Sequence, residues 1–162
     1  MVPRELLYAV VKDQRKELEM RGGLVERELG EKIGKGLKEI ACVVKGVRRC
    51  GKSTLLKQLM RQRFGEGFFY VNFDDERLIG FEAGDFQKLM EVFIEAYGKQ
   101  DAVLLDEVQN VTGWELFVNR LLREGYLVFI TGSNANLLSR ELGTHLTGRH
   151  LDYELYPFSF AE

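Results

Sequence analysis

The residues best suited to chemistry lie in one stretch, Gly46-Val47-Arg48-Arg49-Cys50-Gly51-Lys52-Ser53-Thr54. Two glycines separated by four residues and followed by Lys and Ser match the pattern G-x-x-x-x-G-K-[ST] of a phosphate-binding loop, or Walker A motif. Glycines let the backbone bend so that successive N–H groups point toward one anion. A helix that starts near Lys52 adds the positive end of its dipole. The stretch therefore predicts a site for a nucleoside triphosphate.

Each residue of this loop has an expected role. We expect Lys52 to reach the β- and γ-phosphates, Ser53 to place its hydroxyl on Mg²⁺, and Thr54 to lie near the α-phosphate. The alternative is a chance glycine-rich turn. The flanking sequence disfavours it, because residues 40–44 read as an apolar strand and the apolar residues after the loop recur at helical spacing: Leu55, Leu56, Leu59 and Met60. We therefore predict binding of ATP with Mg²⁺ at residues 46–54.

A second pair of residues supplies what the loop lacks. Residues 102–105 form an apolar strand that runs into Asp106 and Glu107, a Walker B pattern. Asp106 is expected to hold Mg²⁺ through its waters, and Glu107 to polarise an attacking water. Two acids that cap a turn would give the same letters. The spacing of about fifty residues after a phosphate loop favours the metal and base roles.

Further candidates follow the next predicted strand. Ser133 and Asn134 could hydrogen-bond the attacking water and the γ-phosphate as sensors, or could serve as turn or helix-capping residues. Arg140 and Arg149 are candidate cations for a phosphoryl transition state, with Arg149 placed to face a phosphate or a neighbouring subunit. Ordinary surface roles explain both arginines equally well.

The elements that position these residues alternate between strand and helix. We predict strands at 68–73, 102–105, 126–130 and 151–155, and helices at 85–97, 114–123 and 136–142. This alternation implies βαβ crossovers and a mainly parallel sheet. Asp85 is expected to cap the first of these helices and Gly98 to end it. Two further helices, at 3–20 and 25–37, precede the loop; the first could pack on the flank of the core or be an arm that needs a partner.

Bulk properties limit the class of protein. The 162 residues are 45% hydrophobic and 30% charged, as in a globular domain. No apolar run approaches the length of a membrane span and no signal-peptide pattern opens the chain, so we expect a cytoplasmic protein.

The cysteines, histidines and charges give weaker indications. Cys42 lies in a predicted strand and Cys50 in the loop, so no disulfide is expected. His145 and His150 lack metal-ligand spacing. Residues 1–64 carry 16 Lys/Arg against 8 Asp/Glu; solvated helix faces and a phosphate site explain this balance better than nucleic-acid contact.

Five collinear motifs in this chain resemble a family of archaeal and bacterial AAA-superfamily ATPases. They are Gly46–Ser53, Asn72-Phe73-Asp74-Asp75-Glu76-Arg77, Leu105-Asp106-Glu107-Val108-Gln109-Asn110, Thr131-Gly132-Ser133-Asn134 and Leu146-Thr147-Gly148-Arg149. The resemblance implies an α/β, three-layer P-loop fold of the ASCE/AAA type, with a parallel five-stranded sheet of order 5-1-4-3-2. It divides the chain into a helical extension at 1–38 and an ATPase core at 39–162. Longer relatives continue into a C-terminal region, so we expect a fragment or shortened homologue without a helical lid.

The leading functional hypothesis is an ATPase that drives a conformational change in a partner or attached domain. Its expected catalytic residues are Lys52, Glu107, Asn134 and Arg149, with Ser53 and Asp106 at Mg²⁺. A small-molecule kinase and a non-hydrolysing nucleotide-binding scaffold stay open as alternatives, although Glu107 directly after Asp106 favours activated water. Two kinds of partner also stay open: a second copy of the chain, and a nucleic acid or protein that contacts the C-terminal region of longer relatives.

Overall fold

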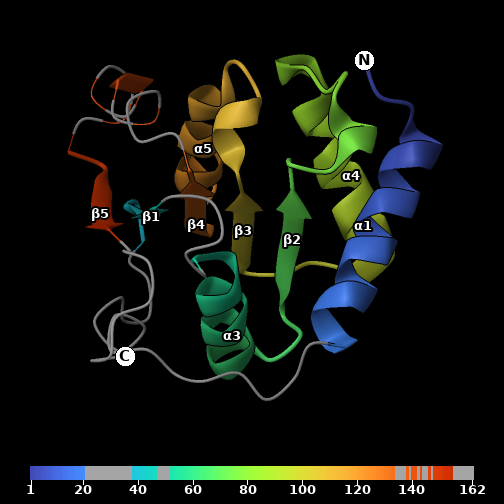
Figure 1. The fold of residues 1–162 in the computed structure, drawn as a ribbon, viewed down its shortest axis with the longest axis horizontal. Helices are drawn as coiled ribbons and strands as arrows, with labels where there is room; N and C mark the ends of the chain where they lie inside the picture. Colours follow the sequence, from blue (N-terminus) through green and yellow to red (C-terminus); the bar gives the residue numbers. More distant parts are fainter. Residues whose placement is uncertain are drawn as a thin grey trace.

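A single parallel sheet forms the centre of the molecule (Figure 1). The computed structural model describes residues 1–20, 38–46, 52–133, 138, 140, 141, 143, 146 and 148–154. Within these residues the strand order is β2-β3-β4-β1-β5, and each neighbouring pair is parallel. Read from the other edge, this is the predicted order 5-1-4-3-2, so the predicted fold class is confirmed. The strands are β1 Ala41–Lys45, β2 Phe68–Asn72, β3 Ala102–Asp106, β4 Leu127–Gly132 and β5 His150–Glu154.

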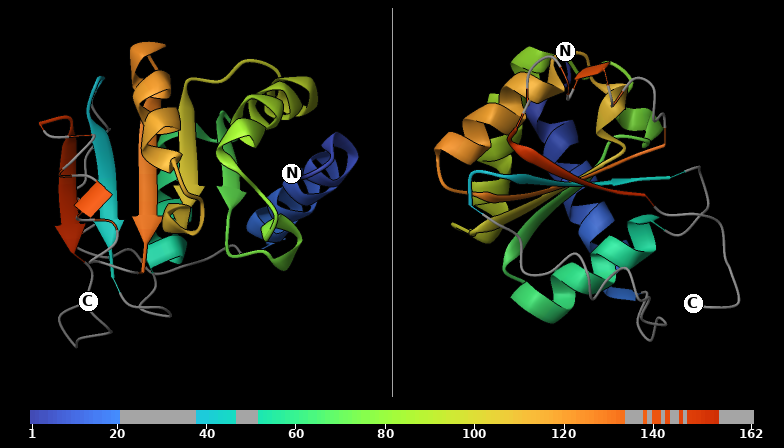
Figure 2. Two further views of the ribbon diagram at one scale, coloured as in Figure 1. Left: turned by 90° about the horizontal axis from the view of Figure 1, so that it is seen from above. Right: turned by 90° about the vertical axis from the view of Figure 1, so that its left-hand side faces the viewer.

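Helices cover both faces of the sheet, which gives three layers (Figure 2). Helix α3, Lys52–Phe64, lies on one face, and helices α4, Phe86–Tyr97, and α5, Trp114–Arg123, lie on the other. Their bounds agree with the predicted helices to within one residue. Three short 3₁₀ turns were not predicted: η1 Glu76–Leu78, η2 Ala83–Asp85 and η3 Val108–Asn110. The predicted helices at 25–37 and, for the most part, 136–142 lie outside the described residues.

The side chains of the strands alternate between two hydrophobic clusters, as the period of two in a strand requires. On β3, Ala102 and Leu104 pack on the α3 side, and Val103 and Leu105 pack on the α4/α5 side. On β4, Phe129 belongs to the α3 side. The next positions of the same parity are polar, Asp106 and Thr131. Both therefore lie on the α3 face, at the end where the strands finish.

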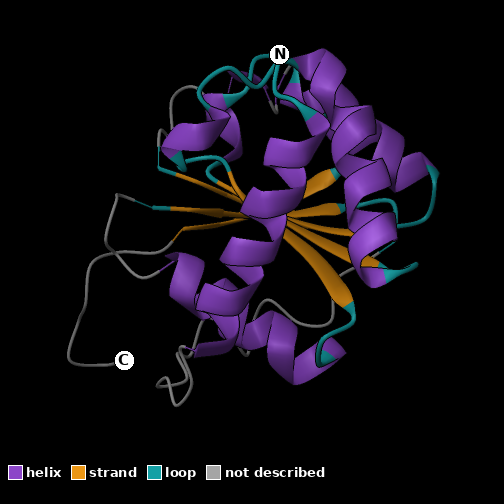
Figure 3. Ribbon diagram, turned by 90° about the vertical axis from the view of Figure 1, so that its right-hand side faces the viewer, coloured by secondary structure: helices purple, strands orange, loops and turns teal. Residues whose placement is uncertain are grey.

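Helix α1, Arg4–Met20, lies along the β2 edge of the sheet and packs on α4 (Figure 3). Its apolar side joins the α4/α5-side cluster through Leu7, Val10 and Val11, all buried. The structure therefore favours packing on the flank over the alternative of an arm that needs a partner.

Two polar side chains of α1 cover the exposed edge of β2. The amide of Gln14 accepts a hydrogen bond from Asn72 N at 2.9 Å and donates one to Asn72 O at 3.0 Å. The guanidinium of Arg15 donates to the carbonyl of Phe68 at 2.8 Å and lies over its ring. An unpaired edge strand would otherwise present these groups to another chain.

One capping prediction was wrong. Asp85 sits at the N-cap of α4 but makes no capping hydrogen bond to that helix. Its carboxylate instead accepts from Glu82 N at 2.9 Å and from Val2 N at 3.2 Å, and pairs with Lys88. Burial opposes ionisation of Asp85, but these bonds lower its pKa overall. Asp85 therefore ties the start of the chain to the helix. Gly98 ends α4 at a φ of 73°, as predicted.

Candidate functional site

The carboxyl ends of β1, β3 and β4 lie close to the start of α3. Gly46, which follows β1, donates a backbone hydrogen bond to Gly132 O at the end of β4, at 3.2 Å. Ser53, in the first turn of α3, donates to Asp106 at the end of β3. Ligands of open parallel sheets bind outside the carboxyl ends of the strands. The predicted phosphate loop and Walker B pair therefore belong to one site.

Asp106 is the fully buried carboxylate of this site. Its Oδ1 accepts from the Ser53 hydroxyl at 2.7 Å and from the Thr131 hydroxyl. Its Oδ2 accepts from the Tyr70 hydroxyl at 2.9 Å. A buried charge needs such partners because water cannot solvate it. The donors come from α3, β4 and β2, so the orientation of this one side chain is fixed by three elements.

Glu107 leaves β3 in a left-handed conformation, with φ 55° and ψ 48°. This conformation costs a non-glycine residue roughly 1–3 kcal/mol, and it persists only where surrounding contacts hold it. Its own N–H donates to Thr131 Oγ1 at 2.8 Å. Thr131 therefore connects both acids, because its hydroxyl donates to Asp106 and accepts from Glu107.

The carboxylate of Glu107 is held by neighbours from two elements. Its Oε2 accepts from Ser133 Oγ at 2.8 Å, from Ser133 N at 3.2 Å and from Gln109 Nε2 at 2.7 Å. The glycine before Ser133 makes room for this arrangement. A Cβ on Gly132 would lie 2.7 Å from Gln109 Oε1 and 2.0 Å from Leu138 Cδ1. Glycine at 132 therefore permits the close approach of Gln109 to the end of β4.

The donor set of Ser53 and Asp106 suits Mg²⁺. One hydroxyl and one carboxylate, both oxygen donors, lie within hydrogen-bonding distance of each other. Mg²⁺ prefers oxygen ligands and is usually held by one or two carboxylates together with substrate phosphates. Across the described part of the chain, no group of three or more His, Cys, Asp or Glu could hold a metal by itself. Ser53 and Asp106 fit a cation that the phosphates of a nucleotide also hold.

The structure describes only some of the other predicted residues. Val47 to Gly51 and Asn134 lie outside the described residues, as does the side chain of Lys52. Arg140 is exposed. Arg149 lies at the start of β5, where its backbone carbonyl accepts from Ala41 N at 2.8 Å and its side chain donates to Asn119 at 3.1 Å. Ala41 begins β1 and Gly46 follows its end, so about 16 Å of strand separates them. Within one chain, Arg149 therefore lies at the amino ends of the strands, whereas the phosphate loop follows the carboxyl end of β1.

Three of the residues that form the site had no predicted role. Tyr70, Thr131 and Gln109 surround the two acids. A usable signal existed for two of them. Tyr70 and Thr131 are hydroxyl-bearing residues at inward positions of otherwise apolar strands, and a buried hydroxyl requires a partner. Gln109 gives no such signal, because its contact depends on the turn at Glu107.

Comparison with known proteins assigns the chain to a family. Residues 38–162 match the family model described as an AAA domain. The chain is 33% identical to an uncharacterized protein of Methanocaldococcus jannaschii over 100% of its own length and 36% of the relative's. It is 42% identical to an uncharacterized protein of Haemophilus influenzae, over 74% of this chain and 32% of that one. The chain therefore spans about a third of the length of these curated relatives.

Two solved structures share the fold. PCH-2 of C. elegans aligns with a TM-score of 0.55 at 16% identity, over 98% of this chain and 42% of that one. The flagellar accessory protein FlaH of M. jannaschii aligns with a TM-score of 0.51 at 17% identity, over 86% of this chain and 82% of that one. At these identities the likeness concerns the fold alone. No helix in the described part of the chain is long and apolar enough to cross a membrane.

Proposed function

Because this chain belongs to the AAA domain family, we propose that it binds ATP with Mg²⁺ and hydrolyses the terminal phosphoanhydride. The observation that carries the proposal is the hydrogen bond between Ser53 and Asp106, with Glu107 held next to it at the same strand end. A hydroxyl and a carboxylate for the cation, and a second carboxylate for water, are the parts that phosphoryl transfer to water requires.

The binding roles follow from the order of the chain. Backbone N–H groups of residues 47–51 and the ammonium of Lys52 would bind the phosphates, with Thr54 near the α-phosphate. Ser53 and Asp106 would hold Mg²⁺, which when bound supplies positive charge to the phosphate oxygens. The hydrogen bond between Gly46 and Gly132 keeps the start of the loop beside the end of β4. On this proposal the phosphates would lie near Ser133.

Glu107 is the proposed general base. Its carboxylate accepts the proton of the attacking water, and Ser133 and Gln109 orient that carboxylate through its Oε2. We assign Ser133 to the base for this reason, and we keep Asn134 as the proposed contact to the γ-phosphate. Arg149 is proposed as a cation for a neighbouring subunit, because within its own chain it lies at the far edge of the sheet.

Turnover is proposed to drive a conformational change in a partner or attached domain. A small-molecule kinase would need an acceptor pocket, and a scaffold would bind nucleotide without turnover. The buried position of Glu107 beside Asp106 favours water as the acceptor. Phosphate release without any added metabolite separates hydrolase from kinase, and binding without release identifies a scaffold.

Titration of a fluorescent ATP analogue with Mg²⁺ into the wild type and Lys52→Ala tests the binding site. Charge-assisted bonds to phosphate contribute roughly 1.5–3 kcal/mol each, so affinity is expected to fall about 10- to 100-fold. Lys99→Ala is the matched control, because Lys99 is exposed and lies just before β3, at the end of the strands away from the phosphate loop. Equal affinities of Lys52→Ala and the wild type would refute the phosphate-loop assignment.

A further inference from the structure

Tyr70 is a buried tyrosine whose hydroxyl reaches the site from β2, a strand on which no site residue was predicted. It lies on β2, in register with Leu104 of β3, and is 4% exposed. Its ring belongs to the cluster on the α3 face, and its hydroxyl donates to Asp106 Oδ2 at 2.9 Å. A diagonal neighbour on the adjacent strand is within the reach of a long aromatic side chain. Tyr70 of β2 therefore contacts Asp106, a proposed Mg²⁺ ligand, from the neighbouring strand.

The hydrogen bonds of Asp106 divide between its two oxygens. Oδ1 accepts from Ser53, the other proposed metal ligand, and from Thr131, whereas Oδ2 accepts from Tyr70. A bond at Oδ2 restrains rotation of the carboxylate about its last torsion, which is otherwise broad. The bond from Tyr70 therefore helps to hold the carboxylate in the plane in which its other oxygen faces Ser53.

The ring of Tyr70 is itself tied to the helix that carries Ser53. The ammonium of Lys57, one turn further along α3, lies 5.0 Å from the ring centroid. A cation over the face of an aromatic ring is attracted to its electrons. One side chain thus connects β2, Asp106 of β3 and helix α3, at the point where the proposed cation would bind.

We propose that Tyr70 is a positioning residue for the divalent cation, acting through Asp106. This inference rests on the proposed function, because it concerns the Mg²⁺ that accompanies the nucleotide. Loss of the hydroxyl leaves the ring in place and removes one of the three hydroxyl donors of a buried carboxylate. Asp106 then turns more freely, and the cation binds more weakly. The proposed effect acts on the cation through Asp106, so we expect nucleotide affinity without a cation to stay the same.

The test is a titration of Mg²⁺ at a fixed, subsaturating concentration of a fluorescent ATP analogue, with wild type and Tyr70→Phe. The expected result is a midpoint about 10-fold higher in Mg²⁺ for Tyr70→Phe, which corresponds to one lost charge-assisted hydrogen bond. A second titration in EDTA measures nucleotide affinity without the cation, and no change is expected there. Tyr126→Phe is the control, because Tyr126 is a partly buried tyrosine just before β4, at the end of the strands away from Asp106.

Each outcome decides the inference. A higher Mg²⁺ midpoint for Tyr70→Phe alone, with unchanged affinity in EDTA, supports it. A midpoint equal to or below that of the wild type overturns it, and so does a parallel loss of affinity in EDTA, which would indicate a merely structural role. If the wild type itself binds the analogue no better with Mg²⁺ than without, the proposed function fails, and that result is distinct from any effect of Tyr70.

Discussion

Glu107 combines a costly backbone conformation with a fully engaged carboxylate oxygen. Its left-handed φ and ψ turn the side chain away from the line of β3 and toward Ser133. Glu107 is kept there by the bond that its N–H donates to Thr131 and by the bonds that its carboxylate accepts from Ser133 and Gln109. Strain that neighbouring contacts hold in place is a mark of functional positions. The geometry therefore supports a base whose orientation is set before the substrate binds.

We predict that Glu107→Gln keeps affinity for Mg²⁺-ATP and lowers the rate of hydrolysis about 10²- to 10⁴-fold, the usual contribution of a general base. The amide retains the shape of the side chain and can still accept from Ser133. Phosphate release and analogue binding are measured on the same preparation. Glu124→Gln, at an exposed position just after α5, serves as control. A wild-type rate for Glu107→Gln would exclude Glu107 as the base.

The two cysteines should differ in reactivity. Burial, and secondarily the charge of Asp152, raise the pKa of the Cys42 thiol to about 12. At pH 8 almost none of it is thiolate, the form that reacts. We predict that maleimide modifies Cys50 and spares Cys42, and that Mg²⁺-ATP protects Cys50. Peptide mass mapping after labelling, with urea-unfolded protein as the control that labels both, measures this. Labelling of Cys42 in the folded protein would contradict the burial.

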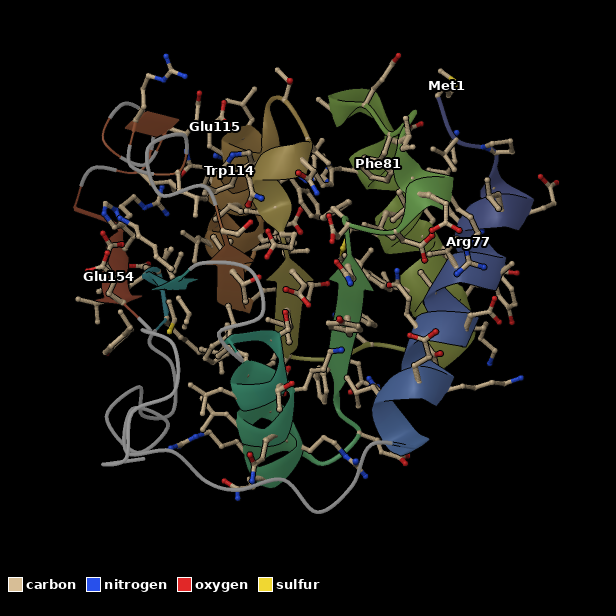
Figure 4. All side chains as sticks on the ribbon, in the orientation of Figure 1. Met1, Arg77, Phe81, Trp114, Glu115 and Glu154 are labelled. Carbon is tan, nitrogen blue, oxygen red and sulfur yellow. The ribbon has the colours of Figure 1, made fainter. Side chains whose placement is uncertain are left out.

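At the scale of elements, α1 is joined to the turn after β2 by charged and amide groups. Figure 4 places Arg77 beside this helix. Arg77 donates to Asp75 and, at 2.7 Å, to Asp13 of α1. Asp75 also accepts from Gln14, at 3.2 Å. Hydrogen bonding with Arg77 is the main reason that the pKa of Asp75 is lowered from 3.8 to about 2.

A lowered pKa means that the ionised Asp75 stabilises the folded state. This contribution is fully present above the unfolded value of 3.8 and is lost as the pH falls through about 2. We predict that Asp75→Asn lowers the free energy of unfolding at pH 7 by on the order of 1–2 kcal/mol, and that the difference from wild type shrinks between pH 4 and pH 2. Urea unfolding across this range measures it, with the exposed Glu91→Gln as control. A difference that is constant with pH would contradict the assignment.

The helices and strands could be predicted where the apolar residues recur at a regular spacing. Features that depend on polar contacts between distant residues could not. Runs such as residues 102–105 gave strands, and the apolar spacing of 86–97 gave α4, because burial of one face dictates the pattern. The role of Asp85 was mispredicted, since its partners are Val2, Glu82 and Lys88 and not the helix end. Covering of the β2 edge by Gln14 depends on where α1 packs, and a local pattern does not contain that information.

At the scale of the whole molecule, the sheet order brings the motifs together. Strand β4 lies between β1 and β3, so its end at Gly132 and Ser133 adjoins both Gly46 and Glu107. This order was predicted from the family resemblance, because spacing along the chain does not give the lateral order of parallel strands. The contact of Tyr70 on β2 with Asp106 follows from the same order. It was not foreseen, because no site residue was predicted on β2.

The same topology separates Arg149 from the phosphate loop of its own chain. Arg149 adjoins Ala41 at the amino end of β1, and Gly46 follows the carboxyl end of the same strand. An arginine supplied in trans can stabilise the transition state of phosphoryl transfer. We therefore predict that Arg149, if it acts in catalysis, does so on a neighbouring subunit, so that each active site takes Glu107 from one chain and Arg149 from the next.

Mixing of two inactive variants tests this arrangement. Arg149→Ala and Glu107→Gln are each expected to hydrolyse ATP poorly when alone. In a mixture, an Arg149→Ala chain still supplies Glu107, and a neighbouring Glu107→Gln chain still supplies Arg149, so some sites contain both residues and turnover recovers. Arg123→Ala, at the last turn of α5 on the exposed surface, replaces Arg149→Ala in a control that should be active alone. If both variants are inactive alone and their mixture stays inactive at concentrations where chains associate, Arg149 does not complete the site of a neighbour. A wild-type rate for Arg149→Ala alone would remove it from catalysis altogether.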